Sequence, residues 1–291
     1  VETENGKKEK IYPTNKLRIP VNKENVLKSG IVKPKDADKI VDYIDITIDE
    51  VGLTKNRILM LDILANNNWE RPIYFTGGSP AAEEYIWLKD YLQLDGLSYK
   101  LVPIKTDMSK RNMFEMGRID PEKMYENFKK LDWRSINDGK IYIDEQAKKN
   151  AISLRNNLIR LSEAFSNKGD TIKAIEVLDL SIEKMPILDF GNIQFSIGYP
   201  ELYYSLNQSK KARAAAKDII SNVKEHLTWF AEFKERDYPM IAEEIDNYFL
   251  MYRNIVSQVN ELDTDEDFKQ QTKEDFINTV KLLSHLIPLE E

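Results

Sequence analysis

The clearest pattern in the chain is a stripe of apolar residues in its second half that recurs every three or four positions. The stripe consists of Ala151, Leu154, Leu158, Leu161 and Phe165. This spacing places the apolar side chains on one face of an α-helix. Gly169 then interrupts the pattern, and Asp170 is a residue type that caps a following helix. The pattern predicts two consecutive helices joined by a short turn.

The two predicted helices have the spacing of a tetratricopeptide repeat. Such a repeat has six characteristic positions, which are in order large, large, aromatic, small, large and proline. In this chain they are occupied by Leu158, Leu161, Phe165, Ala174, Leu178 and Pro186. A second copy lies 38 residues further on, where Tyr203 matches Phe165, Asn207 matches Gly169 and Ala212 matches Ala174. Since the usual period is about 34 residues, we expect a longer connection around residues 190–199. Further amphipathic helices are predicted over residues 211–233, 241–262 and 268–286.

The first half of the chain alternates between predicted strands and predicted helices. Runs of β-branched and aromatic residues predict the strands, and apolar residues at helical spacing predict the helices between them. The strands are residues 43–48, 73–76 and 99–104, and the helices are residues 54–64 and 81–94. This order is typical of a βαβ-type layer. Asp120-Pro121 then predicts the start of a further helix over residues 121–131.

Together these patterns predict a mixed α+β chain that is mostly helical and has three parts. Residues 1–39 form a polar lead-in or linker, residues 40–145 a small α/β domain, and residues 146–291 a tetratricopeptide-like helical stack. The lead-in contains ten Lys or Arg against six Asp or Glu. Because this excess is small, a solvated linker is favoured, and a segment lying against a membrane is the alternative.

Composition removes several classes of function. The net charge of −7 argues against a nucleic-acid-binding protein, which needs a basic surface. The chain has no cysteine, which excludes disulfides, thiolate nucleophiles and cysteine-bound zinc. No apolar run reaches the roughly 20 residues of a membrane-spanning helix. The two histidines, His226 and His285, have no triad-like neighbours in the sequence. We therefore predict no catalytic residue, no metal site and no cofactor.

Two sets of three aromatic residues are candidates for binding. They are Trp69, Tyr74 and Trp87 in the first half, and Tyr199, Tyr203 and Trp229 in the second. The first set offers flat apolar rings that suit the faces of sugars. The second set lies on the predicted repeat helices, which can form a groove for a partner peptide. Packing in the core is favoured for most of the first set and is at least as well supported as binding for the second, because aromatic side chains commonly fill protein interiors.

A glycine-rich turn follows the predicted strand at residues 73–76. Gly77-Gly78-Ser79 precedes a predicted helix, and the N–H groups at the start of a helix attract anions such as phosphate. The sequence contains neither GxGxxG nor GxxxxGK[ST], the two glycine motifs that bind dinucleotides and nucleotide phosphates. A simple tight turn is therefore favoured, and a phosphate-binding turn is the alternative.

Several blocks of sequence resemble a known family. They are Arg18-Ile19-Pro20-Val21-Asn22-Lys23, Ser29-Gly30-Ile31-Val32, the block from Leu64 to Phe75 that contains Asn66-Asn67-Asn68-Trp69, and Met116-Gly117-Arg118-Ile119-Asp120. In these blocks the chain is similar to the soluble C-terminal region of large bacterial multi-pass membrane proteins of unknown function. Those proteins are related to the transmembrane protein O-mannosyltransferases of animals. The Asn-Asn-Asn-Trp block is the distinctive part, whereas the repeat half is generic.

The resemblance implies a parent protein whose N-terminal membrane domain transfers a sugar from a lipid-linked donor. It implies that this chain lies on the extracytoplasmic (periplasmic) side of the bacterial inner membrane, and a cytoplasmic location is the alternative. The catalytic acid of such transferases lies between membrane helices outside this chain, so no catalytic residue carries over. The start at Val1 is interpreted as the cut end of a longer protein.

Three hypotheses for function follow. The first is an accessory domain, not catalytic by itself, whose partners are the membrane-embedded remainder of the parent chain and an acceptor protein or peptide. The second is a stand-alone tetratricopeptide-type scaffold for protein–protein interaction, unrelated to sugar transfer. The third is an enzyme domain that binds a sugar phosphate near Gly77 and Gly78. None of the three involves nucleic acid or a transmembrane segment within this chain.

Overall fold

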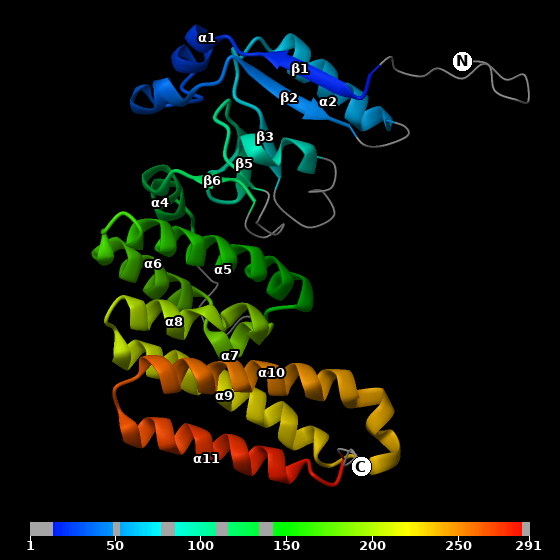
Figure 1. The fold of residues 1–291 in the computed structure, drawn as a ribbon, viewed down its shortest axis with the longest axis vertical. Coiled ribbons are helices and arrows are strands. Elements are labelled where there is room, and N and C mark those ends of the chain that lie inside the picture. The colour runs from blue at the N-terminus through cyan, green and yellow to red at the C-terminus, as the bar shows by residue number, and fades with distance from the viewer. Residues whose placement is uncertain (1–13, 49–52, 77–84, 109–115, 134–141, 287–291) are drawn as a thin grey trace, which may run out of the picture. The chain divides into compact units, whose positions relative to one another are not determined.

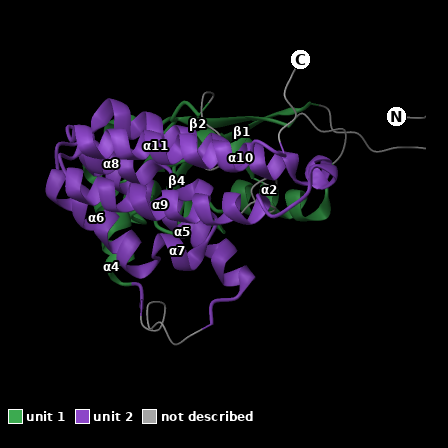
Figure 2. Ribbon diagram, turned by 90° about the horizontal axis from the view of Figure 1, so that it is seen from below, with its two compact units in different colours: residues 1–130 green, residues 131–291 purple. Residues whose placement is uncertain are grey.

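The computed structural model describes residues 14–48, 53–76, 85–108, 116–133 and 142–286 (Figure 1). The chain divides into two compact units, residues 1–130 (unit 1) and residues 131–291 (unit 2), which are coloured separately in Figure 2. Small sheets and short helices make up unit 1, and a stack of longer helices makes up unit 2. The predicted fold class, α+β and mostly helical, is confirmed. The division differs from the predicted boundaries after residues 39 and 145.

Unit 1 contains two sheets and several short helices. Its strands are β1 (Lys16–Pro20), β2 (Tyr43–Thr47), β3 (Tyr74–Thr76), β4 (Leu92–Leu94), β5 (Ser98–Leu101) and β6 (Arg118–Ile119). Its α-helices are α1 (Lys23–Lys28), α2 (Lys55–Asn66) and α4 (Pro121–Lys129), and its 3₁₀ helices are η1 (Pro34–Lys39) and η2 (Ile86–Tyr91). As the sequence predicts, Asp120 caps α4, because its carboxylate accepts a hydrogen bond from the N–H of Lys123.

Residues 14–39 of the predicted lead-in belong to the folded part of unit 1 and do not form a separate linker. Strand β1 pairs antiparallel with β2, so residues 16–20 and 43–47 form one two-stranded sheet across the expected boundary at residue 39. Ile19 is buried opposite Ile44, and Val26 of α1 is fully buried. Ile31 and Val32 are buried as well, whereas Leu27 is 37% exposed. Burying these apolar side chains holds the described part of the segment in place.

The second sheet has the order β3-β5-β4-β6, which differs from the predicted βαβ layer. Strand β5 pairs antiparallel with β3 and with β4, whereas β4 and β6 are parallel. The predicted helix over residues 81–94 is wrong at its end, since residues 92–94 form strand β4; residues 81–84 lie outside the described residues. A three-residue turn around Gly96, whose φ is 106°, joins β4 to β5. Such a short connection permits only an antiparallel pair, because parallel strands need a crossover of a dozen or more residues.

Unit 2 is a stack of helices that follow one another in chain order (Figure 1). They are α5 (Glu145–Ser166), α6 (Thr171–Lys184), α7 (Ile187–Phe190), η4 (Ile193–Ser196), α8 (Gly198–Ser205), α9 (Ser209–Phe230), η5 (Glu235–Asp237), α10 (Tyr238–Leu262) and α11 (Glu266–Leu282). Helix α5 packs on α6, α8 on α9, α9 on α10, and α10 on α11. The longer connection predicted around residues 190–199 is present and contains the end of α7 and η4.

The two repeat-like helix pairs, α5–α6 and α8–α9, end their first helices in the same way. Gly169 and Asn207 both have positive φ angles, of 79° and 59°. The N–H of the next residue then donates to the carbonyl of the matched aromatic residue, Phe165 in one pair and Tyr203 in the other, at 3.0 and 2.8 Å. Asn replaces Gly in the second copy because Asn also tolerates this left-handed conformation. The 38-residue register predicted from the sequence is therefore the structural register.

Asp263 connects the end of α10 to α8 and α9. Its buried carboxylate accepts two hydrogen bonds from the guanidinium of Arg213, both at 2.7 Å, and one from the hydroxyl of Tyr204. The backbone N–H of Asp265 donates a further hydrogen bond. Burial raises the pKa of the Asp263 carboxyl, but the hydrogen bonds from Arg213 and Tyr204 outweigh burial and hold the pKa well below its usual range.

This depressed pKa predicts that Asp263 makes unit 2 sensitive to acid. An unfolded Asp has a pKa of about 3.9, so below that pH the unfolded chain takes up a proton that the folded chain does not. The stabilisation is complete above about pH 4 and is lost by about 1.4 kcal/mol per pH unit as the pH falls toward the folded pKa. We expect urea unfolding to show a steeper loss of stability between pH 4 and 2 in the native chain than in Asp263→Asn. Equal slopes in the two proteins would contradict the assignment.

Candidate functional site

A row of polar side chains crosses one face of the four-stranded sheet. In the register of the sheet, Tyr74 lies opposite Lys100, Lys100 opposite Gln93, and Gln93 opposite Arg118. Directly opposed residues share a face of a sheet, so these four residues point to the same side. We call them the polar row. The other face carries Phe75, Leu92, Leu94, Tyr99 and Leu101. Its rings pack with Tyr85, which makes this face part of the core of unit 1.

Three members of the polar row, Gln93, Lys100 and Arg118, line a pocket of about 200 Å³ within unit 1. We call it the polar pocket. Three segments form it: the connection from α1 into η1, the sheet, and the start of α4. Its lining residues are Gly30, Ile31, Val32, Lys33, Asp36, Gln93, Lys100, Ile104, Arg118, Asp120, Lys123 and Glu126. Seven of these twelve side chains are charged, so the pocket is suited to a polar or charged ligand and not to an apolar one.

Lys100, one of the residues that line the polar pocket, belongs to a buried ion pair. The ammonium Nζ of Lys100 lies 3.1 Å from Oδ2 of Asp95, and each residue is only 6 or 7% exposed. The side-chain amide of Gln93 donates to Oδ1 of Asp95 at 2.7 Å, and the amide of Asn127 donates to its backbone carbonyl at 2.8 Å. Burial and the nearby carboxylate of Asp95 raise the pKa of Tyr74, so its hydroxyl stays protonated.

Ion pairs also hold the rim of the polar pocket. Lys33 Nζ lies 2.7 Å from Oδ2 of Asp120. Burial raises the pKa of Asp120, but the hydrogen bonds from Lys33 and from the N–H of Lys123 outweigh it and hold the pKa below its usual range. The hydrogen bond from Lys39 likewise lowers the pKa of Asp36. The rim carboxylates are therefore charged at neutral pH and act as hydrogen-bond acceptors. Among the described residues, no group of His, Cys, Asp and Glu is arranged to hold a metal ion.

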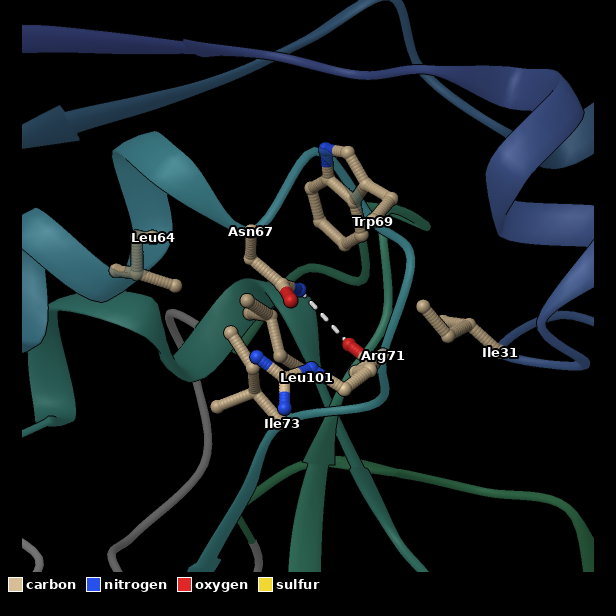
Figure 3. Close-up of a pocket in the computed structure, with 7 residues that line it drawn as sticks. All are labelled: Ile31, Leu64, Asn67, Trp69, Arg71, Ile73 and Leu101. Atoms are coloured by element: carbon tan, nitrogen blue, oxygen red, sulfur yellow. Dashed lines mark hydrogen bonds between the residues drawn. The ribbon is translucent and has the colours of Figure 1, made fainter.

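The ring of Trp69, a candidate for sugar binding, is packed inside unit 1. It is 6% exposed, and its indole N–H donates to the carbonyl of Pro20 at 2.9 Å. Figure 3 shows it beside a small cavity that is also lined by Ile31, Leu64, Asn67, Arg71, Ile73 and Leu101. This cavity has about 10 Å³ of free space, room for about one water molecule. Core packing, the favoured interpretation of this aromatic set, therefore describes Trp69, since no sugar ring fits there.

The Asn-Asn-Asn-Trp block is a structural turn that holds the lead-in of unit 1. Asn68 and Trp69 have positive φ angles of 45° and 60°. Asn22 and Asn25, at the start of α1, donate side-chain hydrogen bonds to the side-chain and backbone oxygens of Asn68. Asn67 donates to the carbonyl of Arg71 at 2.7 Å, drawn as the dashed line in Figure 3. The distinctive sequence block therefore connects β1 and α1 to the segment between α2 and β3.

The other two aromatic candidates of the first half lie apart from Trp69. Tyr74 is 50% exposed at the end of the polar row. Trp87 is partly buried and lines a different cavity of about 360 Å³, together with Thr47, Ile48, Leu53, Arg57, Leu61, Ile86 and Lys89. The structure therefore does not bring the three rings to one surface. Tyr74 and Trp87 each stay a prediction as single binding residues.

In unit 2, two of the three predicted groove residues are buried. Tyr199 is fully buried with its hydroxyl 2.6 Å from that of Ser181, and Tyr203 is 2% exposed and donates to Asp179 at 3.0 Å. Their rings fill the space between the repeat helices and offer no surface to a peptide. Trp229 is 53% exposed on α9 and contacts the rings of Phe230 and Phe233. It remains the predicted partner-binding residue of unit 2.

The sequence interpretation missed Gln93, Lys100 and Arg118. A signal for the first two was present, because each is a polar residue flanked on both sides by apolar or aromatic residues in a strand. Gln93 lies between Leu92 and Leu94, and Lys100 lies between Tyr99 and Leu101. Polar residues alternating with apolar ones share a face of the sheet. The Gly77-Gly78-Ser79 turn lies outside the described residues.

Comparison with known proteins gives one match. Residues 1–123 match the family model of TMEM260-associated domain 2. No curated protein and no solved structure matches the chain. Within the described residues, no helix has the length and apolar content that crossing a membrane requires. The matched segment contains the Asn-Asn-Asn-Trp turn, the polar row and all but one residue of the polar pocket. Over most of unit 1, the chain is thus similar to an accessory domain of TMEM260-like proteins.

Proposed function

We propose that this chain is a non-catalytic accessory region of a TMEM260-like membrane protein that transfers a sugar from a lipid-linked donor. The membrane-embedded remainder of the parent chain carries the reaction, and this region lies on the extracytoplasmic side and binds the acceptor polypeptide. The match of residues 1–123 to TMEM260-associated domain 2 carries the proposal. The resemblance of the same segment to the C-terminal regions of bacterial membrane proteins supports the sugar-transfer part.

The surface around Trp229 supports acceptor binding. The Trp229 ring packs edge-on against Phe233, with ring centroids 4.9 Å apart, and lies 5.0 Å from Phe230. These contacts fix the ring while half of it remains exposed. Met240, at the start of α10, is 73% exposed. A rigid, exposed Trp beside aromatic neighbours is the residue type that dominates binding energy at protein interfaces.

A scaffold without any role in sugar transfer is the second candidate. The observation that favours it is the repeat register of unit 2, in which Gly169 and Asn207 end equivalent helices. Stacked helix pairs of this kind present extended surfaces to proteins of many functions. The two candidates differ in the partner that they predict: a polypeptide that carries the transferred sugar for the first, and one without it for the second.

Photocrosslinking in the full-length parent protein tests the proposal. The photoreactive residue p-benzoylphenylalanine replaces Trp229 in cells that express the parent, and crosslinked products are analysed by mass spectrometry. We expect adducts with a polypeptide that carries the transferred sugar. The matched control places the same residue at Tyr142, which is 85% exposed in unit 2 and lies away from the α9 aromatic cluster in sequence.

The outcomes separate the candidates. Sugar-bearing adducts at position 229 and none at position 142 support acceptor binding. Adducts at 229 with polypeptides that carry no sugar contradict acceptor binding and favour the scaffold. If no adduct forms at position 229, both candidates are contradicted for this surface.

A further inference from the structure

We propose that the polar pocket of unit 1 binds the phosphate monoester of a small polyol or sugar. The phosphate is held between Lys100 and Arg118, and the hydroxyl groups lie against the carboxylates of the rim. None of the residues that line this pocket belongs to the Gly77-Gly78-Ser79 segment or to the Trp229 aromatic cluster. It does not depend on acceptor binding being correct, because different side chains in a different unit carry it.

The first observation is that Lys100, which lines the pocket, is mostly buried and has one ionic partner among the described residues. The residue is 6% exposed, and its only ionic contact among the described residues is Oδ2 of Asp95 at 3.1 Å. That contact lacks hydrogen-bond geometry, since Oδ2 accepts no hydrogen bond. A Lys ammonium has three N–H donors, so it can bind an oxyanion in addition to its contact with Asp95. An oxyanion in the adjoining pocket supplies further acceptors.

The second observation is that Arg118 reaches the same pocket from the other side of Gln93. Lys100 and Arg118 lie on the two strands that flank β4, so their Cα atoms are separated by two strand spacings, about 10 Å. Both side chains are long enough to converge on one group between them. The nearest carboxylate to the Arg118 guanidinium, that of Asp36, is 4.0 Å away and accepts a hydrogen bond from Lys39 instead. The planar fork of Arg118 is therefore available for the paired oxygens of an oxyanion.

The rest of the lining selects among oxyanion ligands. Asp36, Asp120 and Glu126 also line the pocket, and three carboxylates repel a bare anion. They accept hydrogen bonds from hydroxyl groups, so a phosphate that carries a hydroxylated group is favoured over inorganic phosphate. None of the lining residues is aromatic, so the pocket offers no ring for stacking a nucleobase. With about 200 Å³, the pocket fits a small phosphorylated polyol or sugar and not a polymer.

Isothermal titration calorimetry of the 291-residue chain with glycerol 3-phosphate tests this site. We expect saturable binding that is tighter than that of inorganic phosphate, and none for glycerol. Arg118→Gln should weaken glycerol 3-phosphate binding by at least about tenfold, since it removes charge-assisted hydrogen bonds. Arg118 is changed because its only ion pair among the described residues, with Asp36, is long at 4.0 Å, so its removal should disturb the fold little. Changing Lys100 would instead leave the buried carboxylate of Asp95 without its positively charged partner.

The matched control is Lys130→Gln, which removes one positive charge from the exposed end of α4 in the same unit. It should bind glycerol 3-phosphate as the native chain does. If Arg118→Gln fails to fold, NMR titration of the native chain replaces it, and the amides of residues 30–36, 93, 100 and 118 should shift. Absence of saturable binding, equal binding by Arg118→Gln, or shifts confined to other residues would overturn the proposal.

Discussion

Replacing Arg155 by methionine is expected to lower the free energy of unfolding of unit 2 by about 3 kcal/mol, because three carbonyls and a hydroxyl each lose a hydrogen bond. Arg155 is 1% exposed on α5. Its guanidinium donates to the carbonyls of Met185, Pro186 and Gly191 at 2.8–3.0 Å, and to the hydroxyl of Ser196 at 3.4 Å. These acceptors lie in the connection between the two repeat-like pairs.

The size of this effect follows from where the acceptors are. The chain leaves α6 at Met185 and turns through α7 and η4 before α8 begins. Of the three carbonyls, that of Pro186 also accepts the N–H of Phe190 within α7, at 3.3 Å. One planar guanidinium satisfies several of them at once, which a methionine does not. Burial lowers the pKa of Arg155, but an arginine stays charged at any pH of interest. Removing the guanidinium also removes the cost of burying a charge. This gain offsets part of the lost hydrogen-bond energy and limits the expected decrease in the free energy of unfolding.

Urea unfolding followed by far-UV circular dichroism measures this change, since the helices of unit 2 dominate the signal. Arg155→Lys should lose an intermediate amount, because an ammonium group reaches fewer of the carbonyls. The control is Arg253→Met on the exposed side of α10, which should change stability by less than about 0.5 kcal/mol. A loss in Arg155→Met no larger than in the control would show that the connection finds other donors.

Replacing Trp69 by alanine is expected to cost unit 1 about 3 to 5 kcal/mol, as is usual for a buried tryptophan. The ring is 6% exposed beside Ile31, Leu64 and Leu101, so its loss opens a cavity between the lead-in and the sheet. The hydrogen bond from its indole N–H to Pro20 is lost as well, which frees the end of β1. Hydrogen exchange of the β1 and β2 amides, followed by NMR, measures the loss of protection.

Two variants separate the causes of this effect. Trp69→Phe keeps most of the ring and loses the N–H donor, so it should lose less than Trp69→Ala. Leu59→Ala in α2 is the control, because Leu59 is 63% exposed and its truncation opens no cavity. Amide protection in Trp69→Ala that equals the protection in Leu59→Ala would show that the Asn-Asn-Asn-Trp turn does not hold the lead-in.

The sequence by itself determined the helices of unit 2 and their register. A helix forms through contacts between residues three or four positions apart. Its apolar stripe, its N-cap and its end can therefore be predicted from residues close together in the sequence. Asp170 was predicted to cap α6, and its carboxylate does accept from the N–H of Lys173 at 3.1 Å. Gly169 and Asn207 likewise mark their turns, because only a few residue types tolerate a positive φ angle.

Only the tertiary structure decided the pairing of the strands and the identity of the buried polar groups. Strand β1 finds β2 across the predicted boundary at residue 39, and the polar row unites residues from four separate strands. Whether Tyr203 is exposed or Trp69 is packed depends on side chains far away in sequence. Strand pairing and burial are non-local, and the local pattern of a short strand is compatible with several partners. The helices were therefore readable from the sequence, whereas the polar pocket appeared only once the sheet had formed.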